Sequence, residues 1–440
     1  MGEVANIPQL RFPEFDQPLL TDILLNLTDV LRCGIAATPK YVDSGITFLS
    51  SQNVTPTGKI LMDKCNFISE DYYKKISKNA KLLKGDILYS RVGARYGNAA
   101  IFPFEGDYGV YVSLTHIRAS QKLDNTFLKF LLNSPIGKTQ AKKGVFQGGG
   151  VPNLNVKVVE KFKINFPSKP EQQKIAAFLT AVDAKIEQLI KKKELLDEYK
   201  KGLMQQIFSQ AIRFHSKGTS SQAQGEIDDT PGQPLLPNGN SPSGSDFPDW
   251  EEKKLGDITD LITKGTTPTS VGYNFTTEGI NFIKVESIKN FKIDIGSVPK
   301  ISEECHHHLK RSQLKNNDIV FSIAGTLGRT AIVKNKDLPA NTNQALSIIR
   351  LNRSQHILFV HYLLNLESID KYIHRMLSVG AQPNLSLQQV GDIQLQLPSL
   401  LEQSKITNFL SSIDNKIEQV GKQLDESKQF KKALLQQMFI

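Results

Sequence analysis

The chain has 440 residues, which is too many for one ordinary hydrophobic core and favours two or three domains. Its hydrophobic content of 39% and charged content of 22% are typical of a globular protein, and no apolar run approaches the roughly 20 residues that cross a bilayer, so no membrane-spanning helix is expected. The net charge of +10 favours a polyanionic partner without identifying it.

The N-terminal stretch MGEVANIPQLRFPEF has no basic segment followed by an apolar one. We therefore expect no secretory signal and a cytoplasmic location. Cys33, Cys65 and Cys305 are scattered and odd in number, which predicts free thiols rather than a disulfide framework.

Residues 1–169 are predicted to form a first domain. Short apolar strands at Asp86–Ser90 and Val110–Arg118 alternate with glycine-containing turns, and a helical piece is expected near Phe127–Leu132. The pattern predicts a mixed α/β domain built largely on sheet.

The loop SRVGARYGNAA after the first of these strands holds the first candidate DNA-binding residues. Glycines let a backbone approach a groove, and Arg bonds bidentately to guanine or neutralises phosphate. The alternative is a solvated hairpin that happens to hold arginine. Gly149 is a further candidate, because Gly148–Gly150 would let backbone approach a phosphate, although a turn before Val151 explains this run equally well. The candidates of the loop are Ser90, Arg91, Arg95 and Tyr96.

Residues 170–209 are predicted to form a long helix, with apolar residues spaced by three, four or seven over Glu171–Ser209 and no Gly or Pro before Gly202. Such a stripe indicates a partner helix, or alternatively packing on the helix's own domain. Its expected pairing and partner-docking residues are Ile175, Leu179, Ile186 and Leu196. Residues 210–246, rich in Ser, Gly, Pro, Gln and Asn, are predicted to be a flexible linker.

Residues 247–399 are predicted to form a second domain related to the first. The motif RFPEF at Arg11–Phe15 is answered by DFPDW at Asp246–Trp250, and Pro152-Asn153-Leu154 by Pro383-Asn384-Leu385. Strands are expected at 319–323 and 345–350, and a helical piece at 357–364. The loop SIAGTLGRTAI matches the glycine-containing loop of the first domain, and its candidate DNA-binding residues are Ser322, Thr326 and Arg329.

Residues 400–440 are predicted to form a second long helix. Over Glu402–Ile440 it is identical to Glu171–Ser209 at nearly half of the ungapped positions, which indicates an internal duplication. We expect the two helices to pair as an antiparallel coiled coil and to act as a spacer of about 57 Å. The pairing and docking residues of the second copy are Ile406, Leu410, Ile417 and Leu424.

No catalytic constellation is found. The sequence lacks a GxGxxG loop, a GxxxxGK[ST] loop, a Gly-x-Ser-x-Gly elbow, and the DPPY or NPPF type of methyltransferase motif, so catalytic residues are predicted to be absent. Cys305-His306-His307-His308 does not predict a metal site, because adjacent ligands rarely complete a tetrahedron and no second cluster lies nearby in sequence.

The duplicated arrangement resembles the specificity subunit of type I restriction-modification systems. The resemblance rests on two divergent units that begin FPEF or FPDW and end P-N-L…P, each followed by an EQ(Q/S)KI helix that closes with QQ(I/M)F, and it spans essentially the whole chain. It implies two target-recognition domains, each reading half of a bipartite, asymmetric double-stranded DNA site.

The same resemblance implies a non-catalytic chain. Two methyltransferase subunits and motor-nuclease subunits would methylate adenine and cleave DNA, and S-adenosylmethionine, ATP and Mg would bind on those partners, with no cofactor in this chain. The physical interpretation agrees, since two similar units joined by antiparallel helices can match the dyad of a duplex. The competing hypothesis is a coiled-coil scaffold that binds nucleic acid non-specifically, through charge alone.

Overall fold

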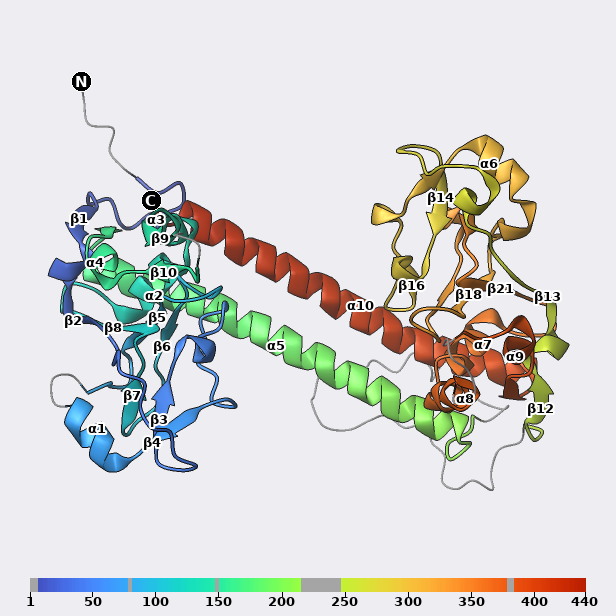
Figure 1. The fold of residues 1–440 in the computed structure, drawn as a ribbon, viewed down its shortest axis with the longest axis horizontal. Helices are drawn as coiled ribbons and strands as arrows, with labels where there is room; N and C mark the ends of the chain where they lie inside the picture. Colours follow the sequence, from blue (N-terminus) through green and yellow to red (C-terminus); the bar gives the residue numbers. More distant parts are fainter. Residues whose placement is uncertain (1–6, 78–80, 147–149, 215–246, 378–383) are drawn as a thin grey trace. The chain divides into compact units, whose positions relative to one another are not determined.

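The computed structural model describes residues 7–77, 81–146, 150–214, 247–377 and 384–440. These form two compact units, unit 1 from Met1–Lys192 with Val420–Ile440, and unit 2 from Lys193–Gln419. Each unit therefore contains a part of both long helices together with one sheet-containing region (Figure 1). Residues 210–214 of the predicted linker are described, and residues 215–246 lie outside the described residues.

Unit 1 is built on a four-stranded antiparallel sheet in the order β2-β8-β5-β6 and a three-stranded sheet in the order β4-β3-β7, in which β3 is parallel to β7. The antiparallel pairs β1-β11 and β9-β10 complete it. Its elements are β1 Leu20–Ile23, η1 Leu24–Leu27, β2 Thr28–Cys33, β3 Ile46–Leu49, η2 Ser51–Asn53, β4 Asn66–Ile68, α1 Glu70–Ile76, β5 Ile87–Ser90, β6 Ala99–Ile101, β7 Tyr108–Val110, β8 Leu114–Ala119, α2 Asn125–Asn133, α3 Pro135–Gly144, β9 Val145–Phe146, β10 Asn153–Leu154, α4 Val156–Val159 and β11 Lys163–Phe166.

The strand predicted at Val110–Arg118 is wrong as one element. β7 ends at Val110 and β8 begins at Leu114, with a turn between them that is closed by a hydrogen bond from the Leu114 amide to the Tyr111 carbonyl, at 2.9 Å. β7 belongs to the three-stranded sheet and β8 to the four-stranded sheet. The chain therefore changes sheet within a stretch that contains neither Gly nor Pro to mark the turn.

Unit 2 repeats the two sheets with the strand orders β13-β21-β18-β19 and β17-β14-β20, and the pair β12-β22 corresponds to β1-β11. Its elements are β12 Glu251–Lys254, η3 Leu255–Ile258, β13 Thr259–Lys264, η4 Pro268–Val271, β14 Ile280–Ile283, η5 Val285–Ser287, β15 Ile288–Lys289, β16 Lys292–Ile293, η6 Ile295–Ser297, β17 Lys300–Ile301, α6 Glu303–His308, η7 Lys310–Ser312, β18 Ile319–Ser322, β19 Thr330–Ile332, η8 Asn335–Asp337, β20 Ala340–Thr342, β21 Leu346–Leu351, α7 Ile357–Leu363, α8 Glu367–Leu377, α9 Leu387–Gly391 and β22 Gln394–Leu397. The matching orders confirm the duplication of the globular parts.

One inner strand of each four-stranded sheet, β5 or β18, is covered on both faces. In β5, Ile87 and Tyr89 join the cluster that includes α2 and the helix ends, whereas Leu88 joins the cluster with Phe102 on the other face. β18 shows the same alternation in unit 2. Because side chains of a strand alternate between faces, a strand with consecutive apolar residues, such as ILYS or IVFS, is expected only where both faces are buried.

The two long helices are α5, Lys169–Phe208, and α10, Leu400–Gln437. In unit 1, Ile175 and Leu179 near the start of α5 pack with Leu434 and Met438 near the end of α10. In unit 2 the end of α5, at Leu203 and Ile207, packs in one cluster with Ile406, Leu410 and Ile413 of α10. The start of each helix thus meets the end of the other, which confirms antiparallel pairing.

Candidate nucleic-acid interface

The glycine-containing loops after β5 and β18 have the same closure in both units. The Gly97 amide donates to the Ser90 carbonyl at 2.7 Å, and the Gly328 amide donates to the Ser322 carbonyl at 3.0 Å. Gly97 and Gly328 have φ angles of 79° and 77°. A side chain is strained in this left-handed region, so the closure requires glycine, and the two loops are equivalent elements.

Arg91 lies inside unit 1 and holds this loop to two other segments. Its guanidinium donates to the Leu154 carbonyl at 2.9 Å, the Val112 carbonyl at 3.0 Å and Asn153 Oδ1 at 3.2 Å. The residue is only 8% exposed. A base contact by Arg91 would require the loss of these three bonds, so its placement indicates a structural role, contrary to what the loop sequence suggested.

The serine that closes each loop is also buried. Ser322 Oγ donates to the Thr326 carbonyl at 2.6 Å and accepts from the Arg329 amide at 2.7 Å, so it shapes the loop from within. Ser90 is fully buried, and its hydroxyl has no hydrogen-bond partner among the described residues. Neither serine reaches the surface as placed.

Arg95 and Arg329 are exposed. Arg95 Nη1 donates to the Gln52 carbonyl at 2.6 Å, and Arg329 Nη1 lies 3.5 Å from the Val285 carbonyl. Gln52 belongs to η2 and Val285 to η5, which follow β3 and β14, two strands at the centres of the equivalent three-stranded sheets. In each unit one arginine therefore lies at the junction of the loop and this 3-10 turn.

The remaining candidates differ in placement. Thr326 is exposed at its loop tip, and Tyr96 is half-buried against the core of unit 1. Gly149 lies outside the described residues. For every exposed candidate, DNA contact stays a prediction.

The register of the two loops separates the arginines. The Ser90 amide bonds to the Asn98 carbonyl and the Ser322 amide to the Arg329 carbonyl, so Arg329 corresponds to Asn98. The loop of unit 1 is one residue longer between its closing serine and glycine. The two equivalent loops thus carry their exposed arginines at different positions along the loop.

An ion pair at the start of β5 and of β18 is the same in both units. Arg118 bonds to both carboxylate oxygens of Asp86 at 2.7 and 2.8 Å, and Arg350 bonds to both oxygens of Asp318 at 2.7 Å. Burial acts to raise the pKa of Asp86, but hydrogen bonds from Arg118, His116 and the Leu83 amide outweigh it and lower the pKa to about 2. The pairs fix strands β5 and β18 to their neighbours.

The residues predicted to pair the helices are covered by the chain itself. Ile175, Leu179, Ile406, Leu410 and Leu424 are at most 8% exposed. Ile186, Leu196 and Ile417 are half-buried. Ile175, Leu179, Ile406 and Leu410 belong to the clusters in which the two helices pack together. Docking of a partner subunit would have to use other faces of the helices.

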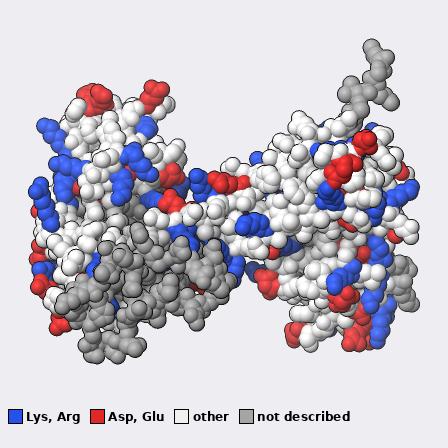
Figure 2. Space-filling view, turned by 180° about the vertical axis from the view of Figure 1, so that it is seen from behind, with Lys and Arg blue, Asp and Glu red and all other residues white. Residues whose placement is uncertain are grey.

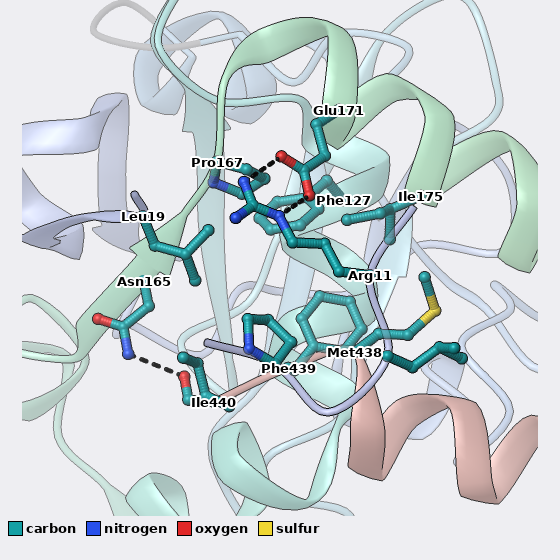
Figure 3. Close-up of a pocket in the computed structure, with 12 residues that line it drawn as sticks. Arg11, Leu19, Phe127, Asn165, Pro167, Glu171, Ile175, Met438, Phe439 and Ile440 are labelled. Atoms are coloured by element: carbon teal, nitrogen blue, oxygen red, sulfur yellow. Dashed lines mark hydrogen bonds and ion pairs between the residues drawn. The ribbon is translucent and has the colours of Figure 1, made fainter. Parts of the chain in front are cut away.

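The sequence analysis missed a clamp at the start of each helix, and Figure 3 shows the clamp of unit 1. Arg11 donates to both carboxylate oxygens of Glu171, at 2.7 and 2.8 Å, in a small pocket lined by Phe127 and Phe439. In unit 2, Arg213 donates to both oxygens of Glu402 at 3.2 and 2.9 Å. Each arginine sits in a Leu-Arg-Phe or Ile-Arg-Phe triplet, and this repeat marks the two arginines but not the glutamates that they bind.

The glutamine after each clamped glutamate completes the joint. Gln172 Nε2 donates to the Pro167 carbonyl, and Gln403 Nε2 to the Pro398 carbonyl, both at 2.9 Å. Their Oε1 atoms accept from the Asp124 amide and the His356 amide, at 2.8 and 2.9 Å. The EQ dipeptide that marks both helix starts therefore attaches each helix to its own domain.

A second repeated contact lies further along the helices. Lys431 pairs with Asp183 at 2.5 Å in unit 1, and Lys200 pairs with Asp414 at 2.6 Å in unit 2. Lys129 also lies 3.7 Å from Asp183, and its burial lowers its pKa to about 8. The corresponding residue of unit 2 is His361, whose burial lowers its pKa to about 4.

The CHHH segment lies in α6, where Cys305 is buried and His306 bonds to Asn341. Within the described ranges, no group of three or more His, Cys, Asp or Glu side chains is placed to hold a metal ion. Figure 2 shows Lys and Arg on both units, with Asp and Glu among them. In the described parts of the chain, no helix has the length and apolar character that a bilayer crossing demands.

Two repeated α/β units joined to paired helices, with exposed arginines at equivalent junctions, define a protein of duplicated architecture with one candidate nucleic-acid-binding surface in each unit. Residues 40–197 and 248–427 match the family model described as "Type I restriction modification DNA specificity domain", and the chain belongs to this family. It is a specificity subunit, which contributes DNA sequence recognition rather than catalysis and works with other subunits of the system.

Similar proteins cover most of the chain. The type I restriction enzyme MjaVIII specificity subunit of Methanocaldococcus jannaschii is 27% identical over 377 residues, 84% of this chain and 81% of that protein. The HindI specificity subunit of Haemophilus influenzae is 25% identical over 413 residues, 82% of this chain and 89% of that protein. The crystal structure of the S subunit from M. genitalium, at 16% identity, covers 99% of both chains with a TM-score of 0.57 and shows the same fold.

Proposed function

We propose that the chain reads a bipartite DNA site with two unlike halves, one by each unit. The observation that carries this proposal is that the two units share a framework but differ in their exposed loop residues. The sheets, the Asp86–Arg118 and Asp318–Arg350 pairs and the helix clamps are repeated, whereas the exposed loop residues are not. Two equivalent frames with different exposed donors are suited to different base sequences.

The partners that we propose are two methyltransferase subunits, which methylate adenine in the site, and motor-nuclease subunits, which cleave DNA. S-adenosylmethionine, ATP and Mg would bind on those subunits. The net charge of +10 supports contact with the phosphate backbone. Because the substrate is cellular DNA, we also propose a cytoplasmic location.

Methylation mapping in a host with and without this gene, the partner genes being present in both, tests the proposal. We expect methylated adenines in one gapped, asymmetric sequence, present only with the gene. Methylation at scattered sequences, or the same map in both hosts, would contradict it. Exchange of one unit's loop for that of another family member should change only one half of the methylated sequence.

A further inference from the structure

The 3-10 turn η5, which Arg329 reaches, is closed by two hydrogen bonds. The Lys284 amide donates to Ser287 Oγ at 3.1 Å, and the Ser287 amide donates to the Lys284 carbonyl at 3.0 Å. Val285 and Ser287 are buried, so the residue between them is held outward. That residue is Glu286, which is exposed.

Glu286 has a free carboxylate. Within the described parts of the chain it makes no side-chain hydrogen bond or ion pair, although exposed glutamates such as Glu187 and Glu418 pair with lysines. Arg329 reaches the same turn, with Nη1 3.5 Å from the carbonyl of the preceding residue, Val285. An exposed cation of unit 2 therefore reaches the same turn that carries this exposed carboxylate.

The equivalent turn of unit 1 differs at this position. Gln52 occupies it, with Arg95 on its carbonyl at 2.6 Å and its own Nε2 donating to the Lys64 carbonyl at 3.2 Å. The amide of Gln52 is thus partly engaged within the domain, whereas the carboxylate of Glu286 is not. The two turns share a backbone but present different chemistry.

A carboxylate near a DNA-binding arginine is repelled by phosphate, and it accepts hydrogen bonds without donating any. The donors that DNA offers in the major groove are the exocyclic amino groups, and Glu accepts from cytosine N4. Resting on the proposed function, we propose that Glu286 is a specificity-determining residue that accepts a hydrogen bond from a cytosine amino group in the half-site read by unit 2. Arg329 provides the adjacent contact to guanine or phosphate.

The test uses the full chain assembled with its modification subunits and a DNA library randomised in both half-sites. The variants are Glu286→Gln and, as a matched loss of one exposed negative charge in the same unit, Glu303→Gln in the first turn of α6. For Glu286→Gln we expect the preference for cytosine at one position to fall by about fivefold or more, the lower end of a good side chain–base contact, while the other half-site is unchanged. Because an amide also donates, the preference should move towards adenine.

An unchanged base preference with uniformly tighter binding, as expected for Glu303→Gln, would overturn the inference and leave Glu286 only as a repulsive charge. A change in the half-site read by unit 1 would overturn it too. If the unmodified complex shows no preferred sequence at all, the proposed function itself fails, and this outcome is distinct from a normal site that Glu286→Gln leaves unaltered.

Discussion

The clamp between Arg11 and Glu171 gives a quantitative prediction about stability. The Glu171 side chain is 2% exposed and the Arg11 side chain 12%, so the glutamate is the desolvated member of the pair. Arg11→Met keeps much of the aliphatic contact but leaves a buried carboxylate without its partner. Removing one member of a buried pair costs about 3 to 5 kcal/mol.

We expect the melting temperature of Arg11→Met to fall by about 6 to 20 °C, since about 1 kcal/mol corresponds to about 2 to 4 °C at this domain size. Differential scanning calorimetry of the full chain measures it. The double variant Arg11→Met/Glu171→Leu should regain most of the loss, because replacing both members of a buried pair by apolar residues is often neutral. Arg213→Met should reproduce the effect in unit 2.

The matched control is Lys59→Met, which breaks the Lys59–Glu187 pair, whose side chains are 52% and 50% exposed. An exposed pair contributes about 0 to 1 kcal/mol, so this variant should melt almost normally. The reasoning is refuted if Arg11→Met is no more destabilising than Lys59→Met, or if the double variant is as unstable as the single one.

Three further predictions concern charge. The pKa of Asp86 is lowered from 3.8 to about 2 in the folded chain, so it contributes about 2 kcal/mol above pH 4 that is lost as pH falls towards 2; acid denaturation of Asp86→Asn should lack this dependence. Because the pKa of Lys129 is lowered from 10.5 to about 8, its charge destabilises the fold at pH 7 and the cost disappears as pH rises through 8 towards 10.5. Lys129→Met should therefore gain about 1 to 3 kcal/mol in urea denaturation at pH 7 and little at pH 10.5, and a loss at pH 7 would contradict this. Arg95→Ala should relax one half-site and Arg329→Ala the other, by about 1 to 3 kcal/mol for a guanine contact in site selection, whereas equal weakening of all sequences would indicate phosphate contacts.

The duplication and the paired helices were predictable from the sequence, because the repeated residues keep one register and the apolar residues of the helices keep a regular spacing. Identities such as Phe178/Phe409 and Asp183/Asp414 keep one register, and the structure places them in equivalent surroundings, with Phe12 and Phe214 each 5.8 Å from its partner ring. The spacing of apolar residues in the helices can likewise be recognised without any tertiary contact. These are the features for which sequence and structure agree.

The sequence could not show which arginine of the first loop is buried and which is exposed. Arg91 and Arg95 lie four residues apart in one glycine-containing loop, but Arg91 is held inside by the carbonyls of Val112 and Leu154 and by Asn153 Oδ1. The clamp of Arg11 joins residues 160 positions apart. Contacts of this range are set by the folded chain, and a local pattern carries no record of them.

The position of Arg91 shows how the duplicated frame tolerates divergence. Its counterpart in unit 2 is Ile323, which is 4% exposed and keeps the same backbone pattern, since its carbonyl accepts from the Leu385 amide at 2.9 Å as that of Arg91 accepts from Leu154 at 2.8 Å. The same buried position is thus occupied by a hydrogen-bonded guanidinium in unit 1, at Arg91, and by an alkyl side chain in unit 2, at Ile323. The backbone bonds keep the loop in place in both units, which leaves the exposed positions beside η2 and η5 free to differ. This separation of a constant frame from variable contacts is what the proposed recognition of two unlike half-sites would use.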